Sequence, residues 1–360
     1  MKTYKHLWET FISEENIRKA IRKSSLGKRK RRTVKAIFDN QEESIPEIKA
    51  YAENFKNANH KPKRIYDGIV RKVRYIVVPT YKEQVIHHMV VNVLMPMFTK
   101  GMFEHSYGSV PERGGHKGKE TIKKWIRKGS RNVKYCLKMD IKKYFESIPH
   151  DILKTKLARK IKDERFLAVV NEIIDVVDKG LPLGFFTSQW LANWYLQDLD
   201  HYIKEELQAI YYMRYMDDMV VFSGNKRKLH EMRVAICKYL AKLGLQMKSN
   251  WQVFRFNYNG KYRHLDFMGF RFYRSRTTLR KSILLRATRK AKRMGMKAKT
   301  TIYDCRQMLS YLGWIKATDT YGIYLERIKP YVDFGKCKKR ISKYQRRINK
   351  CGIAQVMTAT

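Results

Sequence analysis

Three aspartates lie at the ends of segments that predict β-strands, and together their carboxylates could hold metal ions. Asp140 ends the segment "KYCLKMD", and Asp217 and Asp218 lie in "MRYMDDMVVFSG", whose apolar flanks predict a β-hairpin. Asp140 is distant from the pair in the sequence, so only tertiary structure could bring the three together. Converging carboxylates repel one another unless cations lie between them, and Mg²⁺ prefers carboxylate oxygens. Taken alone, an Asp-Asp pair in a turn is ordinary, because aspartate favours turns.

The charge of the chain indicates the partner of such a site. Its 360 residues include 77 Lys+Arg and 33 Asp+Glu, for a formal net charge of +44. The commonest partner of such an excess is a polyanion, because neutralised phosphates release their counterions. The basic residues are spread along the whole chain, which favours a nucleic-acid groove over a membrane surface. Since two Mg²⁺ ions can clamp a phosphoryl displacement, the site predicts nucleotidyl transfer or phosphodiester cleavage.

Composition excludes several other classes of protein. The length of 360 residues suits two or three packed subdomains, and the 44% of hydrophobic residues can form a sizeable core, which a disordered basic tail could not. The five cysteines include no C-x-x-C pair, which argues against a structural zinc site or a disulfide framework and suits a reducing cytosol. The longest apolar stretch, Val85 to Phe98, is short and interrupted by polar residues, so we expect no membrane span. The chain is therefore expected to be cytoplasmic.

The order of the predicted elements indicates an α+β fold. An N-terminal basic mixed region precedes a central region of alternating strand and helix patterns, and a basic helical region follows from about Leu279. Residues 80–98 predict a mostly buried helix. A long helix is expected over 188–207, with Thr187 or Ser188 as its N-cap. The basic run from Leu26 to Arg32 fits a solvated surface and a nucleic-acid contact about equally well.

Several motifs, in the same order along the chain, resemble those of reverse transcriptases. "YMDD" on an apparent hairpin looks like their catalytic signature, and "MDIKKYFESIPHDIL" resembles the block with the first catalytic aspartate. "GLPLGFFTSQWLANWYLQDLD" resembles the block that contacts template and nucleotide. "HLDFMGFRF" looks like the primer-grip hairpin, and "LSYLGWIKATDTYGIY" is similar to the thumb segment of bacterial members. The resemblance covers roughly residues 60–330.

The resemblance implies a right-hand polymerase with fingers, a palm built on an antiparallel sheet, and a helical thumb. We expect an N-terminal basic helical extension over 1–60 and fingers over 61–132. The palm should cover 133–278, with a finger-like helical insertion at about 150–180, and the basic helical thumb and tail should cover 279–360. In this arrangement the C-terminal basic helices would hold nucleic acid through its phosphates.

The resemblance also implies how the acidic residues act. Asp140 and Asp217 should ligate two Mg²⁺ ions, with Asp218 assisting and the carbonyl of Ile141 completing one shell; Mn²⁺ is an alternative ion. Neighbouring strand residues point to opposite faces, so Asp217 and Asp218 cannot be equivalent. The expected activity is RNA-directed DNA polymerisation.

A second set of residues is expected to bind the deoxynucleotide. Phe145 matches the aromatic residue that acts in this family as a steric gate against a ribose 2′-OH, although a core aromatic is the plainer interpretation. RNA-dependent RNA polymerases typically have G-D-D and an acid at the gate, whereas this chain has Met216 and Phe145. By resemblance, the triphosphate and template would meet Lys72, Arg74, Arg113, Gly184 and Gln189, and Lys248 is a candidate for protonating the pyrophosphate.

The assignment to a subfamily depends on the segment Leu181–Gln189. Group II intron enzymes typically read P-Q-G and then S-P here, whereas this chain reads "LPLGFFTSQ", which looks most like the reverse transcriptases of diversity-generating retroelements. Members of that group copy a template RNA, misincorporate opposite adenines and bind an accessory protein. A retron-type or defence-associated enzyme is the alternative. A basic RNA-binding scaffold with an unused polymerase fold is a more distant one. The implied partners are a structured RNA template, a DNA or RNA primer and dNTPs.

Overall fold

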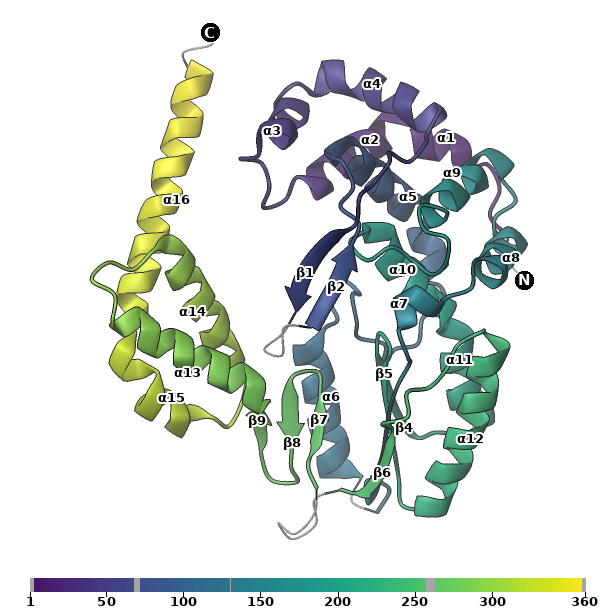
Figure 1. Cartoon of the computed structure of the whole chain (residues 1–360), viewed down its shortest axis with the longest axis vertical. Helices are drawn as coiled ribbons and strands as arrows, with labels where there is room; N and C mark the ends of the chain where they lie inside the picture. Colours follow the sequence, from purple (N-terminus) through teal and green to yellow (C-terminus); the bar gives the residue numbers. More distant parts are fainter. Residues whose placement is uncertain (1–2, 68–71, 130, 257–262, 358–360) are drawn as a thin grey trace. The chain divides into compact units, whose positions relative to one another are not determined.

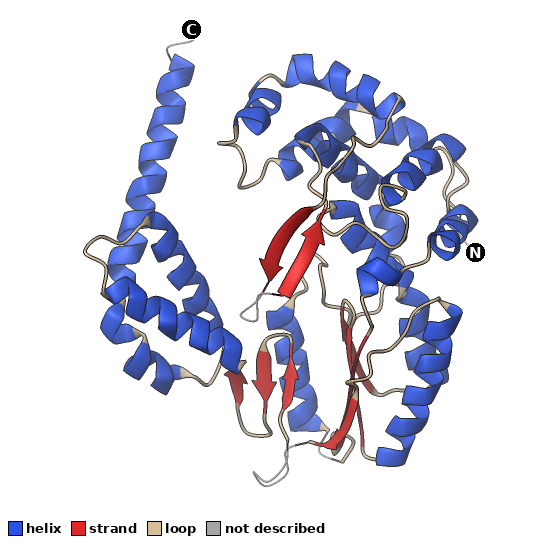
Figure 2. Ribbon diagram, in the orientation of Figure 1, coloured by secondary structure: helices blue, strands red, loops and turns tan. Residues whose placement is uncertain are grey.

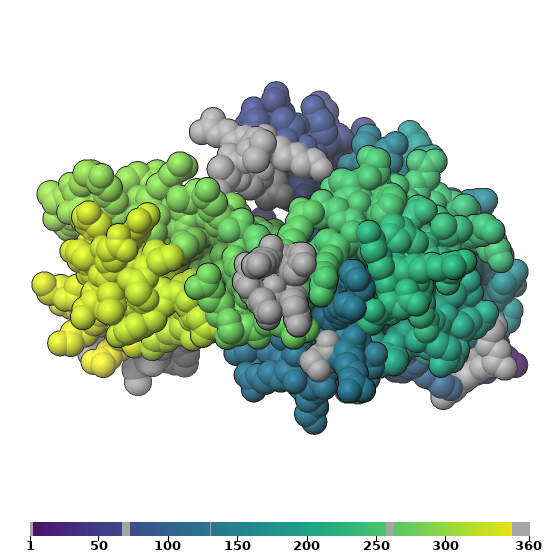
Figure 3. Space-filling view, turned by 90° about the horizontal axis from the view of Figure 1, so that it is seen from below, coloured from purple at the N-terminus to yellow at the C-terminus, as the bar shows by residue number. Residues whose placement is uncertain are grey.

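The computed structural model describes residues 3–67, 72–129, 131–256 and 263–357. Figure 3 draws the molecule as a space-filling view coloured by residue number. By internal contacts the chain divides into two compact units. Unit 1 contains Met1–Gly114 and Arg131–Phe254, and unit 2 contains Gly115–Ser130 and Arg255–Thr360. Both units mix helices with small antiparallel sheets (Figure 2), so the expected α+β class is confirmed.

Unit 1 is mainly helical, with one four-stranded sheet and one hairpin (Figure 1). Its helices are α1 (Leu7–Ile12), α2 (Glu14–Ser24), α3 (Arg32–Asp39), α4 (Gln41–Glu53), α5 (Tyr81–Thr99), α7 (Tyr144–Ser147), α8 (His150–Lys160), α9 (Glu164–Ile174), α10 (Phe186–Tyr195), α11 (Gln197–His201) and α12 (Lys226–Lys242). Its strands are β1 (Lys63–Asp67), β2 (Lys72–Ile76), β3 (Tyr135–Asp140), β4 (Tyr211–Tyr215), β5 (Asp218–Ser223) and β6 (Gln252–Arg255), whose last residue lies at the start of unit 2.

The four-stranded sheet has the order β4-β5-β3-β6. Strand β5 pairs antiparallel with both β4 and β3, so it lies in the interior of the sheet. It is buried along its whole central part, which explains why "MVVF" is continuously apolar rather than alternating. Helix α12 packs on β3 and β5, and α11 contacts α12. This sheet carries the three aspartates.

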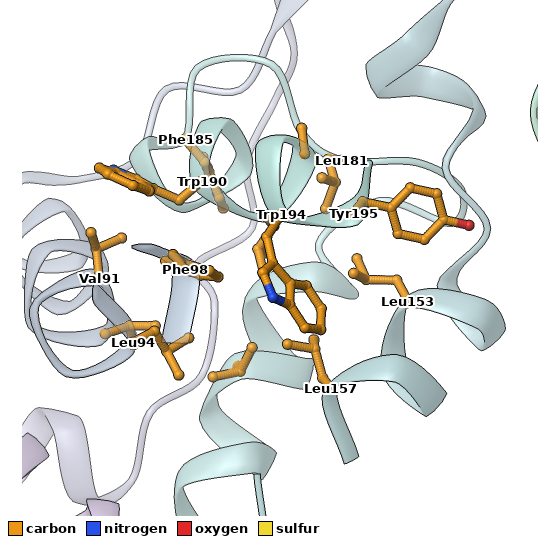
Figure 4. Packing of buried hydrophobic residues seen from close by; sticks show 14 of the residues in the cluster. Val91, Leu94, Phe98, Leu153, Leu157, Leu181, Phe185, Trp190, Trp194 and Tyr195 are labelled. Atoms are coloured by element: carbon orange, nitrogen blue, oxygen red, sulfur yellow. The ribbon is translucent and has the colours of Figure 1, made fainter. Parts of the chain in front are cut away.

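A single large core joins the helices of unit 1. Figure 4 shows Phe98 of α5 beside Trp190 and Trp194 of α10, with Leu157 of α8 on the other side of Trp194. The rings of Phe98 and Trp190 stack with their centroids 5.7 Å apart. Each buried aromatic or aliphatic side chain contributes about 1.5–3 kcal/mol to the free energy of folding, because its apolar surface leaves water. This packing fixes the chain segments that lead to the sheet.

Helix α5 is the long buried helix that the sequence predicts. The hydroxyl of Thr80 accepts a hydrogen bond from the Glu83 N–H at 3.3 Å, and Glu83 accepts one from the Thr80 N–H at 2.6 Å, forming a capping box. Glu83 is fully buried and also accepts hydrogen bonds from the Ala58 N–H and from His60. These partners satisfy its carboxylate inside the apolar core.

The prediction of one long helix over 188–207 is wrong in two details. The chain forms α10, then α11, and ends in a π-helical turn at Tyr202–Glu206. The N-cap is Phe185, without a side-chain cap, rather than Thr187 or Ser188. The hydroxyl of Thr187 instead bonds to Nδ1 of His87 in α5 at 2.9 Å. A buried imidazole needs a partner, so tertiary packing takes the hydroxyl that local pattern assigns to the cap.

Unit 2 contains a three-stranded antiparallel sheet and a set of basic helices. The strands are β7 (Leu265–Phe267), β8 (Phe270–Phe272) and β9 (Thr277–Leu279), and the helices are α6 (Gly115–Lys128), α13 (Lys281–Gly295), α14 (Ile302–Lys316), α15 (Tyr321–Arg327), the 3₁₀ turn Lys329–Tyr331 and α16 (Phe334–Met357). Helix α6 joins this unit although it lies inside the range 61–132 expected for the fingers. The boundaries of fingers, palm and thumb remain predictions. No helix within the described ranges is long and apolar enough to cross a membrane.

Candidate active site

The pairing of β3 with β5 brings the three aspartates to one end of the sheet. Asp140 is the last residue of β3 and Asp218 the first of β5, and the two are direct partners in the antiparallel register. Asp217 lies in the turn immediately before β5. The convergence that the motif order suggests therefore exists in the structure, because a hairpin and a distant strand end at the same edge.

The electrostatics of this edge are unfavourable for three ionised carboxylates. Burial, together with the neighbouring Asp140 and Asp218, raises the pKa of Asp217 to about 7. Asp140 Oδ1 is buried and has no hydrogen-bond partner among the described residues. A proton or a cation would relieve this repulsion. An exposed acidic turn would have neither a raised carboxyl pKa nor a buried carboxylate oxygen without a partner.

Lys248 pairs directly with the first aspartate. Its Nζ donates to Asp140 Oδ2, and its backbone N–H donates to the Asp140 carbonyl at 2.8 Å. The Lys142 N–H donates to the Gln246 carbonyl at 2.8 Å, so residues 246–248 flank a bridge between Ile141 and Met247. The sequence suggested Lys248 as a proton donor, and the structure places its ammonium on a carboxylate. With the Lys248 ammonium on Asp140, the three aspartates do not form a ready-made set of metal ligands, and neither does any other group of three His, Cys, Asp or Glu side chains within the described chain.

A buried arginine supports the turn that carries Asp217, and the sequence reasoning missed it. Arg214 is only 1% exposed, and its guanidinium donates to Asp200 Oδ1 at 2.8 Å and Oδ2 at 2.6 Å. Burial alone would lower the pKa of Arg214, but Asp200 raises it above its usual range, so the guanidinium stays ionised. Tyr212 donates to the same carboxylate at 2.7 Å. The adjacent letters "MRYMDD" were the available signal, since an arginine in a buried strand requires a partner.

The same guanidinium reaches the turn itself. Arg214 Nη1 donates to the Met216 carbonyl at 3.1 Å and to Asn193 Oδ1 at 3.1 Å. Met216 has a positive φ of 56°, which is uncommon for a residue with a side chain. Asn193 in turn donates to the Gly108 carbonyl at 2.6 Å, and Gly108 has no Cβ to collide with Met216. The ion pair therefore holds the conformation of the residue that precedes Asp217.

Phe145 lies on α7, next to the strand end that carries Asp140. Its side chain is partly buried against the core, whereas Tyr144 beside it is fully buried and donates to the Ala192 carbonyl at 2.5 Å. The Phe145 carbonyl accepts a hydrogen bond from the Leu181 N–H at 2.6 Å. The expected gate residue and the segment that decides the subfamily are thus adjacent.

Gly184 and Gln189 border a cavity of about 350 Å³ with Lys28, His88 and Phe186. Gly184 has φ +113°, and a Cβ there would lie 2.2 Å from the Val77 carbonyl. The absence of a side chain at Gly184 therefore lets the backbone approach Val77. The Val77 N–H donates to the Leu183 carbonyl at 2.8 Å. Contact of either residue with a nucleotide remains a prediction.

Two of the basic residues expected at the triphosphate lie on one strand, and the third lies in a loop. Lys72 begins β2, but its side chain lies outside what the structure describes. Arg74 lies two residues further along β2 and is half-buried. Arg113 Nη1 donates to the carbonyls of Phe103 at 2.7 Å and Ser106 at 3.2 Å. These bonds give Arg113 a role in its own loop that the sequence did not indicate.

Comparison with known proteins finds a matching family model and several similar proteins. A family model described as reverse transcriptase (RNA-dependent DNA polymerase) matches residues 59–272. Protein YkfC of Escherichia coli is 22% identical over 222 residues, which cover 50% of this chain and 58% of that protein. The retron Ec73 reverse transcriptase of Escherichia coli is 28% identical over 135 residues, covering 34% of this chain and 43% of that protein. The group II intron-encoded protein LtrA of Lactococcus lactis is 24% identical over 188 residues, covering 48% of this chain and 31% of that protein.

These matches span less than two thirds of each relative's own length. Among solved structures, telomerase from Candida tropicalis in complex with a fragment of telomeric RNA superposes with a TM-score of 0.50 at 14% identity. The alignment covers 71% of this chain and 49% of that one. At this identity the likeness concerns the fold alone. It agrees with the right-hand polymerase architecture that the sequence predicts.

Proposed function

The chain belongs to the reverse transcriptase (RNA-dependent DNA polymerase) family, and from this premise we propose that it copies an RNA template into complementary DNA. The observation that carries the proposal is the register of Asp140 with Asp218 beside Asp217 at one sheet edge. The net charge of +44 supports a nucleic-acid substrate. The proposed substrates are an RNA template, a DNA or RNA primer and dNTPs.

We propose that Asp140 and Asp217 hold two Mg²⁺ ions, assisted by Asp218 and the Ile141 carbonyl, with Mn²⁺ as an alternative. The donors fit a hard cation, because they are carboxylate and carbonyl oxygens. The unpartnered Asp140 Oδ1 and the raised pKa of Asp217 both indicate a need for positive charge. When bound, the ions supply activation of the primer hydroxyl and neutralisation of the leaving phosphates. For Asp140 to bind a cation through both oxygens, Lys248 has to release Oδ2.

The chain's own residues would then align the substrates. In this proposal Phe145 closes the space beside the deoxyribose, and Gln189 and Gly184 lie along the template and nucleotide. Lys72, Arg74 and Arg113 would neutralise the triphosphate. Lys248, once released, would be available to protonate the pyrophosphate.

The biological role that we propose is a diversity-generating retroelement, with mutagenesis directed to adenines and an accessory protein bound. This finer assignment is supported by "LPLGFFTSQ" at Leu181–Gln189. A retron-type or defence-associated enzyme is the second candidate, which the similarity to the retron Ec73 reverse transcriptase favours. Sequencing the cDNA made from a defined template distinguishes them. Errors concentrated opposite template adenines support the retroelement, and errors spread evenly over the four bases support the alternative.

Primer extension on an RNA template tests the activity itself. The wild-type protein should extend a DNA primer with dNTPs and Mg²⁺, and Asp217→Ala should abolish extension. Asp39→Ala, which removes an exposed carboxylate at the end of α3, is the matched control and should extend normally. Extension that survives Asp217→Ala would overturn the metal assignment. A wild-type protein that binds RNA but never extends a primer would favour the non-catalytic scaffold.

A further inference from the structure

A second cavity in unit 1 shares no residue with the candidate active site. It has a volume of about 370 Å³. Its lining comes from four separate segments of the chain, which are the N-terminus, the end of α5, the last turns of α8, and the α10–α11 junction. We call it the α8 pocket, and its principal residues are Tyr4, Lys100, Lys156, Arg159, Lys160 and Trp194.

The α8 pocket concentrates positive charge. Four of its lining residues are cations and one, Asp198, is an anion. Asp198 pairs with Lys156 at 2.9 Å, whereas no carboxylate of the described residues pairs with Lys100, Arg159 or Lys160. Lys156 and Lys160 are four residues apart on α8, a spacing at which like charges repel. The helix dipole favours cations in the last turn of α8, but Lys100 follows a different helix. The pocket therefore has an unneutralised positive charge.

Two walls of this pocket are fixed by hydrogen bonds. Lys156 Nζ donates to the carbonyls of Trp194 at 3.3 Å and Tyr195 at 3.0 Å, and lies 4.7 Å from the centre of the Trp194 ring. The Tyr4 N–H donates to the Lys160 carbonyl at 2.8 Å, and the Tyr4 carbonyl accepts from the Lys162 N–H at 2.8 Å. The backbone of Tyr4 is thus attached to the end of α8 beside the cations. Such preformed walls distinguish the pocket from a set of mobile surface lysines.

We propose that the α8 pocket binds one phosphate-bearing nucleotide. Lys100, Arg159 and Lys160 would hold the phosphate, since guanidinium and ammonium groups are the usual phosphate partners. Tyr4 would face the sugar and base. The volume lies at the lower end of the range for small-ligand sites, which suits a single nucleotide rather than a longer segment. The nucleotide could be free or part of an RNA strand, and the two sources share this chemistry.

Two probes separate the sources. The first is AMP, titrated calorimetrically in EDTA. The second is a fluorescein-labelled single-stranded RNA, whose affinity is measured by anisotropy at several salt concentrations. The test variant is Lys100→Ala/Arg159→Ala. The control is Lys226→Ala/Lys228→Ala, which removes the same charge from exposed positions on α12.

If the ligand is a free nucleotide, AMP should bind one-to-one to the wild type and the control, and at least tenfold more weakly to the pocket variant. If the ligand is part of an RNA strand, the salt slope of RNA binding should fall by about 1.4 in the pocket variant relative to the control. That figure assumes about 0.7 per lost phosphate contact. AMP should also compete with the RNA for the α8 pocket. Equal behaviour of the pocket variant and the control with both probes would overturn the proposal.

Further measurements test whether binding depends on the charge of the pocket and whether it is independent of the candidate active site. The charge-conserving variant Lys100→Arg/Arg159→Lys should retain binding, and with saturating RNA template the pocket variant should extend a primer at the wild-type rate. Asp217→Ala should still bind AMP like the wild type, because the pocket is separate from the aspartates. Failure of the proposed polymerase activity would therefore leave this proposal intact, and the reverse also holds.

Discussion

Arg214 and Asp200 form a fully buried ion pair, and the same guanidinium donates to the carbonyl of Met216, the residue before Asp217. Asp200 belongs to α11 and Arg214 to β4, so the pair connects a helix to the strand that leads into the turn with Asp217. A buried pair of this kind adds little net stability, but breaking it leaves one charge unpaired. We infer that its main effect is to position Asp217.

Asp200→Asn should destabilise the protein by about 3–5 kcal/mol, because it leaves the Arg214 guanidinium buried without its counter-charge. Arg214→Lys keeps the charge but loses the bond to Met216, so kcat should fall while KM for dNTPs changes little. Urea unfolding measures the first effect and steady-state primer extension the second. Glu231→Gln, in the exposed i,i+4 pair with Arg227, is the control and should change stability by less than about 0.5 kcal/mol. A KM effect as large as the kcat effect in Arg214→Lys would contradict the positioning role.

Lys248→Met should lower the Mg²⁺ concentration needed for half-maximal extension, because the ammonium now on Asp140 Oδ2 competes with a cation for that carboxylate. The maximal rate should fall as well if Lys248 also protonates the pyrophosphate. Both quantities come from a Mg²⁺ titration of the extension rate. Lys242→Met, at an exposed position at the end of α12, should leave both unchanged. An unaltered Mg²⁺ dependence in Lys248→Met would show that the contact does not regulate metal binding.

The stability of the metal-free protein should fall as the pH rises from about 4 to 7. Burial, Asp140 and Asp218 raise the pKa of Asp217 to about 7, whereas an unfolded aspartate titrates near its usual pKa of about 3.9. Between these values the folded state holds a proton that the unfolded state has lost, so stability decreases with pH. Melting temperatures measured in EDTA across this range should decline less steeply in Asp217→Asn than in the wild type. Identical slopes in the two proteins would be inconsistent with the raised pKa.

Gly184→Ala should destabilise the fold by at least about 1–3 kcal/mol, because the residue has φ +113° and its Cβ would meet the Val77 carbonyl. Gly313→Ala is the matched control. Gly313 lies in α14, and a Cβ added there would have no neighbouring atom within 4 Å, so alanine should stabilise by about 0.5–1 kcal/mol. Chemical denaturation distinguishes the two substitutions. A stable Gly184→Ala protein that had lost only nucleotide affinity would point to a nucleotide contact instead.

Phe145→Ala should admit ribonucleotides, because the side chain expected to exclude the 2′-OH is removed. Extension with rNTPs and dNTPs, compared as a ratio of kcat/KM, measures the discrimination. Tyr144→Phe changes the neighbouring buried aromatic by removing only the hydroxyl that bonds to Ala192, and it should keep the wild-type ratio. If rNTP use is the same in Phe145→Ala and the wild type, Phe145 is a core residue and not a gate.

The sequence by itself determined the local elements and the kind of chemistry. The apolar segments on either side of Asp217 and Asp218 specify a hairpin, and the run from Thr80 to Phe98 specifies a mostly buried helix. Both are visible because they depend on neighbours a few residues apart. The motif order and the excess of basic residues predict a nucleic-acid polymerase, and the family match agrees. Chemistry of this kind depends on residue types, which sequence states directly.

Only the tertiary structure decided which distant groups meet. The pairing of β3 with β5 brings Asp140 opposite Asp218, and the bridge at Ile141 and Met247 brings Lys248 onto Asp140. The Arg214–Asp200 pair and the approach of Gly184 to Val77 are likewise contacts between separate elements. Local pattern contains no information on which element will pack against which. A buried charge or a missing Cβ signals that a partner is needed, but only the packed fold identifies that partner.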